Sequence, residues 1–146
     1  MEINFKKVHT AKDLIISSSV LTAGIGLFFV NKGLGILFAA CGVGMFFICK
    51  SGYRKDGRGV TLRKVSKDLS KTCRQSVLDY LDGKDISPSI IEGNDGGSIR
   101  IDVFFNESAG VAYAQVFNFD NYAYEPATAL VELHSPKADK LISQIV

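Results

Sequence analysis

Two uncharged apolar stretches, separated by only three residues, dominate the first third of this chain. They cover residues 14–30 (LIISSSVLTAGIGLFFV) and 34–49 (LGILFAACGVGMFFIC), and Asn31, Lys32 and Gly33 lie between them. A bilayer core of roughly 30 Å takes about 20 helical residues, with about 17 as the lower limit. Both stretches are close to that limit, so some local bilayer thinning is expected. The pattern predicts a hairpin of two transmembrane helices.

Three alternatives compete with this interpretation. Short apolar runs also form buried helical hairpins in soluble proteins. A cleaved signal peptide would fit the basic start of the chain, but a second apolar segment follows directly, as a stop-transfer pattern would. Residues 38–41 (FAAC) loosely resemble a lipoprotein cleavage site, yet they lie deep in the sequence and Lys32 interrupts the apolar run before them. We therefore favour the membrane hairpin, which explains both stretches together.

The distribution of basic residues predicts the orientation of the hairpin. Only Lys32 lies in the short turn between the two stretches. The basic residues that precede or follow the hairpin are Lys6, Lys7, Lys12, Lys50, Arg54, Lys55 and Arg58. Because cytoplasmic segments are enriched in Lys and Arg, we expect both termini in the cytoplasm of an inner or plasma membrane.

The remainder of the chain is long enough for one small domain, and its charge is asymmetric. The net charge of the whole chain is +2. Residues 50–74 hold nine Lys/Arg and two Asp, whereas residues 75–146 hold four Lys/Arg and eleven Asp/Glu. A basic block thus follows the hairpin and an acidic region lies beyond it. The predicted organisation is a hairpin over 1–50, a linker over 51–59 (SGYRKDGRG) and an α+β domain over 60–146.

A helix is predicted over residues 60–81. Apolar residues recur there at spacings of three and four, which is typical of one buried helical stripe. That stripe comprises Leu62, Val65, Leu69, Cys73, Val77 and Leu81. A second, basic stripe comprises Lys64, Lys67, Lys71 and Arg74. Gly83 supplies the stop signal.

Strands are predicted for most of the remaining sequence. Residues 98–105 alternate apolar and polar residues, and further strands are expected over 111–117, with Val111, Tyr113 and Phe117 on one face, and over 128–133. Pro136 suits the first turn of a final helix that runs to Val146. Short loops between the strands favour an antiparallel meander of three or four strands. The expected domain is therefore helix, meander, C-terminal helix.

No catalytic motif occurs in this sequence, so we expect a protein that is not an enzyme. A phosphate-binding glycine loop, a Gly-x-Ser-x-Gly elbow and a His-Glu-x-x-His zinc motif are all missing. The two histidines, His9 and His134, are far apart, and the three cysteines show no Cys-x-x-Cys spacing. Neither a metal nor another cofactor is expected. No family resemblance is specific enough to name.

Two surfaces are candidates for binding. The basic residues Arg54, Lys55, Arg58, Lys64, Lys67, Lys71 and Arg74 follow the second stretch and are candidates for anionic lipid headgroups or an acidic partner. Nucleic acid is disfavoured because the basic run lacks interleaved aromatic residues. A loop over 118–126 (NFDNYAYEP) combines aromatic and acidic residues and is a candidate for recognition. Its candidate residues are Phe119, Asp120, Tyr122, Tyr124 and Glu125.

The expected function is that of a small membrane-anchored binding or adaptor module with an unidentified protein partner. Small residues in both apolar stretches, and the hydroxyls of residues 17–19 and 22, would let helices pack closely. Packing within one hairpin is favoured over packing between protomers. The alternative function is a ligand-gated membrane effector that forms homo-oligomers and perturbs the bilayer.

Overall fold

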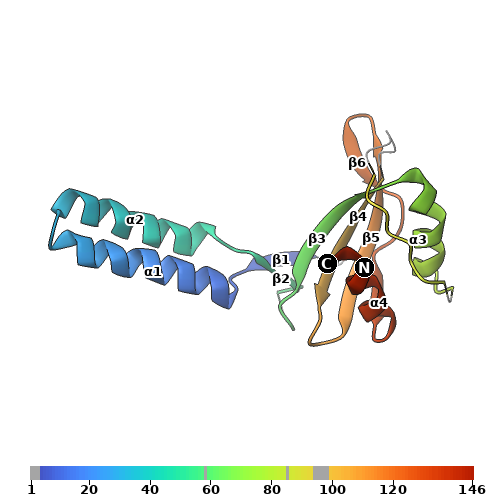
Figure 1. Cartoon of the computed structure of the whole chain (residues 1–146), viewed down its shortest axis with the longest axis horizontal. Coiled ribbons are helices and arrows are strands. Elements are labelled where there is room, and N and C mark those ends of the chain that lie inside the picture. Colours follow the sequence, from blue (N-terminus) through green and yellow to red (C-terminus); the bar gives the residue numbers. More distant parts are fainter. Residues whose placement is uncertain (1–3, 58, 85, 94–98) are drawn as a thin grey trace. The chain divides into compact units, whose positions relative to one another are not determined.

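The computed structural model describes residues 4–57, 59–84, 86–93 and 99–146, and it divides the chain into two compact units. The first unit extends to Thr61 and the second begins at Leu62. Figure 1 shows helices in both units and a larger sheet in the second. The described residues combine helices with antiparallel strands, so the expected α+β character is confirmed.

The first unit is built on two antiparallel helices, α1 (Ala11–Phe28) and α2 (Lys32–Ile48), which lie side by side in Figure 1. Thr10 and Asp13 form a capping box at the start of α1, where each side chain bonds the other residue's backbone N–H. The side chain of Asn31 accepts a hydrogen bond from the first turn of α2. These caps fix the helix starts that the sequence could only bracket.

Three glycines, Gly24, Gly35 and Gly42, let the two helices approach closely. A Cβ on Gly24 would lie 2.4 Å from the backbone nitrogen of Ala39, and one on Gly42 would lie 2.6 Å from that of Leu21. Backbone stands against backbone at these positions, and only glycine leaves the space. These contacts agree with the packing within one hairpin that the sequence favoured.

Both helices carry large apolar side chains on their surfaces. Helix α1 is long and apolar enough to cross a membrane, and only 17% of it is buried. Helix α2 is apolar but shorter, at 17 residues, so the second membrane span stays a prediction. The most exposed large apolar side chains of the first unit are Ile15, Phe47 and Ile48 on the helices and Phe29 and Val30 in the turn between them.

A short ribbon of two strands closes the open end of the hairpin, where α1 begins and α2 ends. Strand β1 (Phe5–Val8) pairs antiparallel with β2 (Gly52–Lys55). The sequence predicted a linker over 51–59, and within it the structure forms a strand over residues 52–55. The strand forms because the polar lead-in, for which no strand was predicted, supplies its partner.

The second unit contains a five-stranded antiparallel sheet. Strand β4 (Ile99–Asn106) lies between β3 (Arg63–Leu69) and β5 (Val111–Asp120). The other edge of β5 pairs with β6 (Ala123–Pro126) near its end and with β7 (Val131–His134) near its start. The strands follow one another as a meander, as expected. The strand that was predicted over 128–133 is β7, which begins later, at Val131, and has only four residues.

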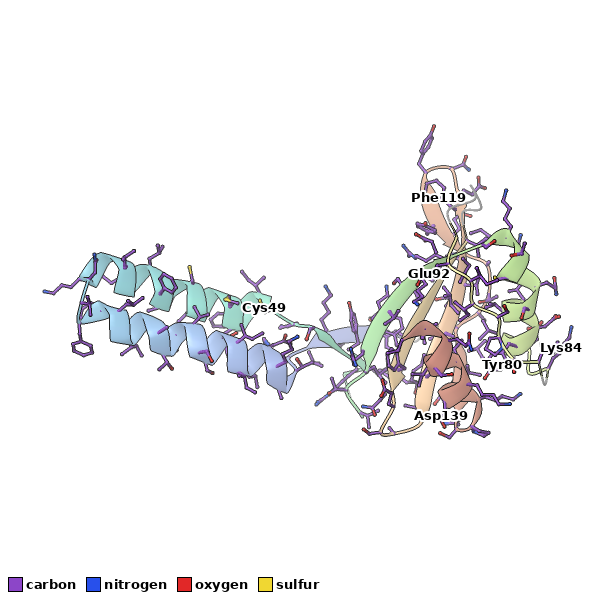
Figure 2. All side chains as sticks on the ribbon, viewed as in Figure 1. Cys49, Tyr80, Lys84, Glu92, Phe119 and Asp139 are labelled. Atoms are coloured by element: carbon purple, nitrogen blue, oxygen red, sulfur yellow. The ribbon has the colours of Figure 1, made fainter. Side chains whose placement is uncertain are left out.

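Two helices, α3 (Arg74–Leu81) and α4 (Lys137–Ile145), cover one face of this sheet. The hydroxyl of Tyr80, labelled in Figure 2, donates a hydrogen bond to the backbone carbonyl of Lys137 and so ties α3 to the start of α4. The C-terminal helix is confirmed. The buried core comprises Leu69, Val77, Tyr80, Leu81, Ile99, Ile101, Val103, Phe105, Ala112, Ala114, Val116, Leu133, Ala138, Leu141, Ile142 and Ile145.

The helix predicted over residues 60–81 is wrong for most of its length. Its first half is strand β3, a short 3-10 turn covers Lys71–Cys73, and only the last eight residues are helical. The apolar residues still become buried, because Leu69 pairs beside β4 and faces the core, and Val77 of α3 packs into the same core. A spacing of three and four therefore described one buried surface made by a strand followed by a helix. Pairing with β4 decides that residues 63–69 form a strand and not a helix.

The facing of β5 also differs from the prediction. The expected inward set was Val111, Tyr113 and Phe117, but Ala112 and Ala114 pair beside the inward residues of β4 and reach the core. Small alanines suit this position because α4 packs close to β5. A slip of one residue in a strand exchanges its two faces, so Phe117 points to the face opposite the helices.

Candidate functional site

The face of the five-stranded sheet opposite α3 and α4 carries a group of charged and aromatic side chains, which we call the outer-face cluster. Register places Lys64 and Asp68 of β3 beside β4, and β4 beside Phe117 of β5. Within the described part of the second unit, both helices pack on the other face. The outer-face cluster comprises Lys64, Asp68, Arg100, Asp102, Phe117 and Tyr124.

Asp102 lies at the centre of this cluster and is only 4% exposed. Its carboxylate lies 2.6 Å from the Nζ of Lys64 and 3.0 Å from the Nε of Arg100. The second contact is an ion pair without hydrogen-bond geometry, and neither atom has a hydrogen-bond partner in the described residues. A buried carboxylate is stable when cations neutralise it, so Asp102 fixes both basic side chains over the sheet.

Arg100 also lies between two aromatic rings. Its guanidinium carbon is 4.0 Å from the centre of the Tyr124 ring and 5.3 Å from that of Phe117. A guanidinium stacks well on aromatic faces, and this arrangement limits its movement. The Tyr124 hydroxyl donates a 3.2 Å hydrogen bond to Asp68. Burial of the ring, and secondly this hydrogen bond, raise the pKa of Tyr124.

The predicted recognition loop over 118–126 is a strand pair instead. Strand β5 continues to Asp120, a two-residue turn follows at Asn121 and Tyr122, and β6 returns along β5. Both turn residues have positive φ, as a tight hairpin requires. Tyr122 is 97% exposed at the tip. The sequence missed this hairpin because the turn lacks glycine.

The five residues predicted for that loop separate between two environments. Tyr124 joins the outer-face cluster, and Phe119 packs beside it with ring centres 5.1 Å apart. Figure 2 shows Phe119 near the β5–β6 turn. Asp120 and Glu125 are exposed on the hairpin, as is Tyr122. Of these five residues, Phe119 and Tyr124 therefore lie at the outer-face cluster.

The structure does not bring the seven predicted basic residues together as one stripe. Arg54 and Lys55 belong to β2 in the first unit, whereas Lys71 and Arg74 lie on the 3-10 turn and at the start of α3. Arg58 lies outside the described residues. The two remaining lysines alternate along β3.

Lys64 and Lys67 have opposite roles, because they point to opposite faces of β3. Lys64 belongs to the outer-face cluster. Lys67 points to the helix-covered face, where its Nζ lies 2.7 Å from Glu92. An inward charge on an edge strand discourages pairing with another chain. The predicted stripe fails because Lys64 and Lys67 lie on a strand, in which neighbours alternate between faces, whereas Lys71 and Arg74 lie beyond it.

A polar group ties the ribbon end of the hairpin together, and we call it the clasp. One oxygen of the Asp13 carboxylate accepts three hydrogen bonds of 2.9 Å, from the backbone nitrogens of Thr10 and Ser51 and from the Ser51 hydroxyl. The ring of His9 contacts the carbonyl oxygen of Cys49 at 2.9 Å. The clasp joins the start of α1 to the chain that leaves α2.

The remaining candidates for chemistry are the histidine, cysteine and acidic side chains. No three His, Cys, Asp or Glu side chains gather there as a metal site. His134 lies 3.6 Å from Glu132 and is largely exposed, whereas Cys73 is buried beside the backbone of Ile91. The contact between His134 and Glu132 is thus a loose surface contact.

Sequence reasoning missed four residues of the outer-face cluster, namely Asp68, Arg100, Asp102 and Phe117. The alternation of residues 98–105 already placed Arg100 and Asp102 on one face of a strand. The partner strand β3 was read as a helix, so Lys64 and Asp68 could not be placed opposite them. Comparison with known protein families, curated proteins and solved structures finds no match to this chain.

Proposed function

We propose that this chain is an integral membrane protein with two membrane-spanning helices, α1 and α2, and that its cytoplasmic α+β unit is a non-enzymatic binding module for a protein partner. The outer-face cluster is the observation that carries the binding proposal. Arginine and aromatic side chains held in place on an exposed face are typical of interaction hot spots. Arg100 and Tyr124 are fixed by Asp102 and Asp68, so little side-chain freedom would be lost on binding.

The apolar surface of the hairpin supports the membrane anchor. Side chains such as Phe29 and Ile48 are more than four-fifths exposed. Soluble monomers rarely carry a continuous apolar surface of this kind, because contact with water disfavours it. Basic residues gather at the ribbon end and only Lys32 lies at the turn, which favours cytoplasmic termini.

The topology can be tested with single cysteines introduced into a variant that lacks the three native ones. Gly33→Cys reports on the turn, and Ser143→Cys reports on the exposed surface of α4. In intact cells an impermeant maleimide should label the turn and should reach position 143 only after the membrane is opened. Labelling of position 143 in intact cells would refute the orientation, and extraction of the chain by alkali would refute the anchor.

The binding proposal is tested by photo-crosslinking in cells. A photoreactive amino acid at Tyr122 lies at the exposed tip of the hairpin that carries Tyr124. The control position is Gln144, exposed on α4 on the helix-covered side of the sheet. We expect one reproducible protein adduct from position 122 and none from position 144. Adducts from both positions alike, or from neither, would contradict a binding face on the outer side.

A second candidate function is a ligand-gated effector whose hairpins assemble and perturb the bilayer. One observation favours it: a Cβ on Gly26 or Gly44 would meet no atom within 4 Å, so these small residues face outward. An open groove on α1 is lined by Leu14, Ile15, Ser18, Ser19, Thr22 and Ala23. Small and hydroxyl-bearing faces promote association of membrane helices. Leakage of a dye from vesicles that contain the chain would support this function, and intact vesicles would count against it.

A further inference from the structure

We infer that the β1–β2 ribbon at the open end of the hairpin binds anionic lipid headgroups. This inference rests on the proposed insertion of α1 and α2 into a bilayer. It assigns lipid binding to the ribbon, which holds Arg54 and Lys55 of the seven basic residues that the sequence suggested, rather than to the whole set. We base this inference on the pairing register and the charge of the ribbon.

Four of the eight ribbon residues are cations, and none is acidic. Lys6 lies directly opposite Arg54 in the antiparallel register, so their side chains project from the same face. On the other face Lys7 and Lys55 are diagonal neighbours, beside the aromatic ring of Tyr53. Like charges at opposite positions destabilise a strand pair.

An isolated ribbon of two strands is marginally stable in water even without such repulsion. A bound anion would remove the repulsion between Lys6 and Arg54. Lys12 and Lys50 add two exposed cations where the helices meet the ribbon. One acid, Asp56, follows Lys55 directly, and a second nearby acid, Asp13, is occupied by three hydrogen bonds inside the clasp. The ribbon end therefore presents a concentrated positive charge.

The position of this charge identifies the anion as a lipid headgroup. The ribbon continues directly from the start of α1 and the end of α2. If the helices occupy the hydrocarbon core, the ribbon lies at the level of the headgroups. Each Lys or Arg near an anionic membrane surface adds to the attraction, so several together favour anionic over neutral lipid strongly.

The experiment uses the full chain in vesicles of phosphatidylcholine, with or without phosphatidylglycerol, and follows amide hydrogen exchange. Anionic lipid should slow exchange of the ribbon amides about tenfold, because bound headgroups stabilise the ribbon. The amides of α1 and α2 should be protected in both lipids. High salt should reduce the lipid effect on the ribbon, since exposed charges are screened.

Two matched variants remove three positive charges each. One changes Lys6, Lys7 and Lys50 to Gln at the ribbon end. The control changes Lys71, Arg74 and Lys140, exposed in the second unit, to Gln. The first variant should lose the lipid effect on ribbon exchange and the control should keep it. The pH is lower at an anionic surface, which slows amide exchange of any chain. Any slowing by anionic lipid that remains in the first variant measures this general effect.

A single substitution separates lipid binding from ribbon stability. Lys6→Glu places opposite charges across the ribbon, so in neutral vesicles its amides should exchange more slowly than in the wild type. In anionic vesicles the same variant should lose the additional protection. Equal ribbon exchange of the wild type in both lipids, or equal loss in the control variant, would overturn the inference. Unprotected α1 and α2 amides would instead refute the membrane anchor.

Discussion

Arg100 on β4 stacks on the ring of Tyr124 on β6, although β5 lies between these two strands in the sheet. The guanidinium reaches across the face of β5, where it also approaches the ring of Phe117. Asp102 forms an ion pair with Arg100, and Asp68 accepts a hydrogen bond from Tyr124. The contact therefore links three strands and makes the outer-face cluster a single ordered unit.

The first prediction concerns the pKa of Tyr124, which burial and the hydrogen bond to Asp68 raise above the usual 10.0. Asp68→Asn removes the negative acceptor, so the pKa of Tyr124 should fall back towards its usual value. Titration by ultraviolet difference absorbance against Tyr124→Phe isolates this residue from the other tyrosines. An unchanged pKa in Asp68→Asn would show that the hydrogen bond has no influence.

The same shift fixes the direction of one pH effect on stability. The folded-state pKa of Tyr124 lies above its unfolded value, so its contribution is fully present below the unfolded pKa. That contribution is lost as pH rises through the folded pKa. Tyr124→Phe should therefore unfold with a weaker pH dependence in the alkaline range above pH 10.0. Parallel curves for the wild type and the variant would contradict this.

The second prediction tests the buried side of β3. Leu69 is fully buried against the sheet and helices, so Leu69→Ala should lower the free energy of unfolding by about 2–5 kcal/mol. Ile86→Ala removes the same number of carbon atoms from a side chain that is 44% exposed and should cost much less. Urea unfolding of the full chain in detergent measures both. Equal losses would mean that β3 does not pack as described.

The third prediction uses the two classes of glycine in α2. Gly42→Ala would place a Cβ 2.6 Å from the backbone of Leu21, so the helices must separate and the hairpin should lose thermal stability. Gly44→Ala meets no atom within 4 Å and should be neutral or stabilising by up to about 1 kcal/mol, because alanine favours helix. Circular dichroism melting in detergent compares them. A greater loss for Gly44→Ala would show that this face is used in assembly.

The fourth prediction concerns the clasp. Asp13→Ala removes the shared acceptor of three hydrogen bonds, so the local stability of the clasp should fall. The backbone amides of Thr10 and Ser51 should then exchange faster. Lys12→Ala, at the exposed neighbouring position, is the control and should leave these amides unchanged in neutral detergent. Unaltered exchange in Asp13→Ala would show that the clasp does not stabilise the ribbon end of the hairpin.

The sequence alone determined the features that depend on local composition. Two apolar runs around Asn31 and Gly33 specify a helical hairpin, because the runs are continuous and the turn is short. The alternation of residues 98–105 specifies a strand with one apolar face, and the final amphipathic segment specifies α4. Each of these elements buries a face that is readable from its own residues.

Tertiary structure decided every feature that depends on a pairing partner. Residues 63–69 fit a helix by spacing, and pairing with β4 made them a strand. Residues 52–55 became a strand because β1 returns to the base of the hairpin. The outer-face cluster depends on the pairing of β3 with β4, since Lys64 and Asp68 reach Asp102 and Tyr124 only once β3 is paired. Strand partners distant in the chain leave no local periodicity, so one sequence does not reveal them.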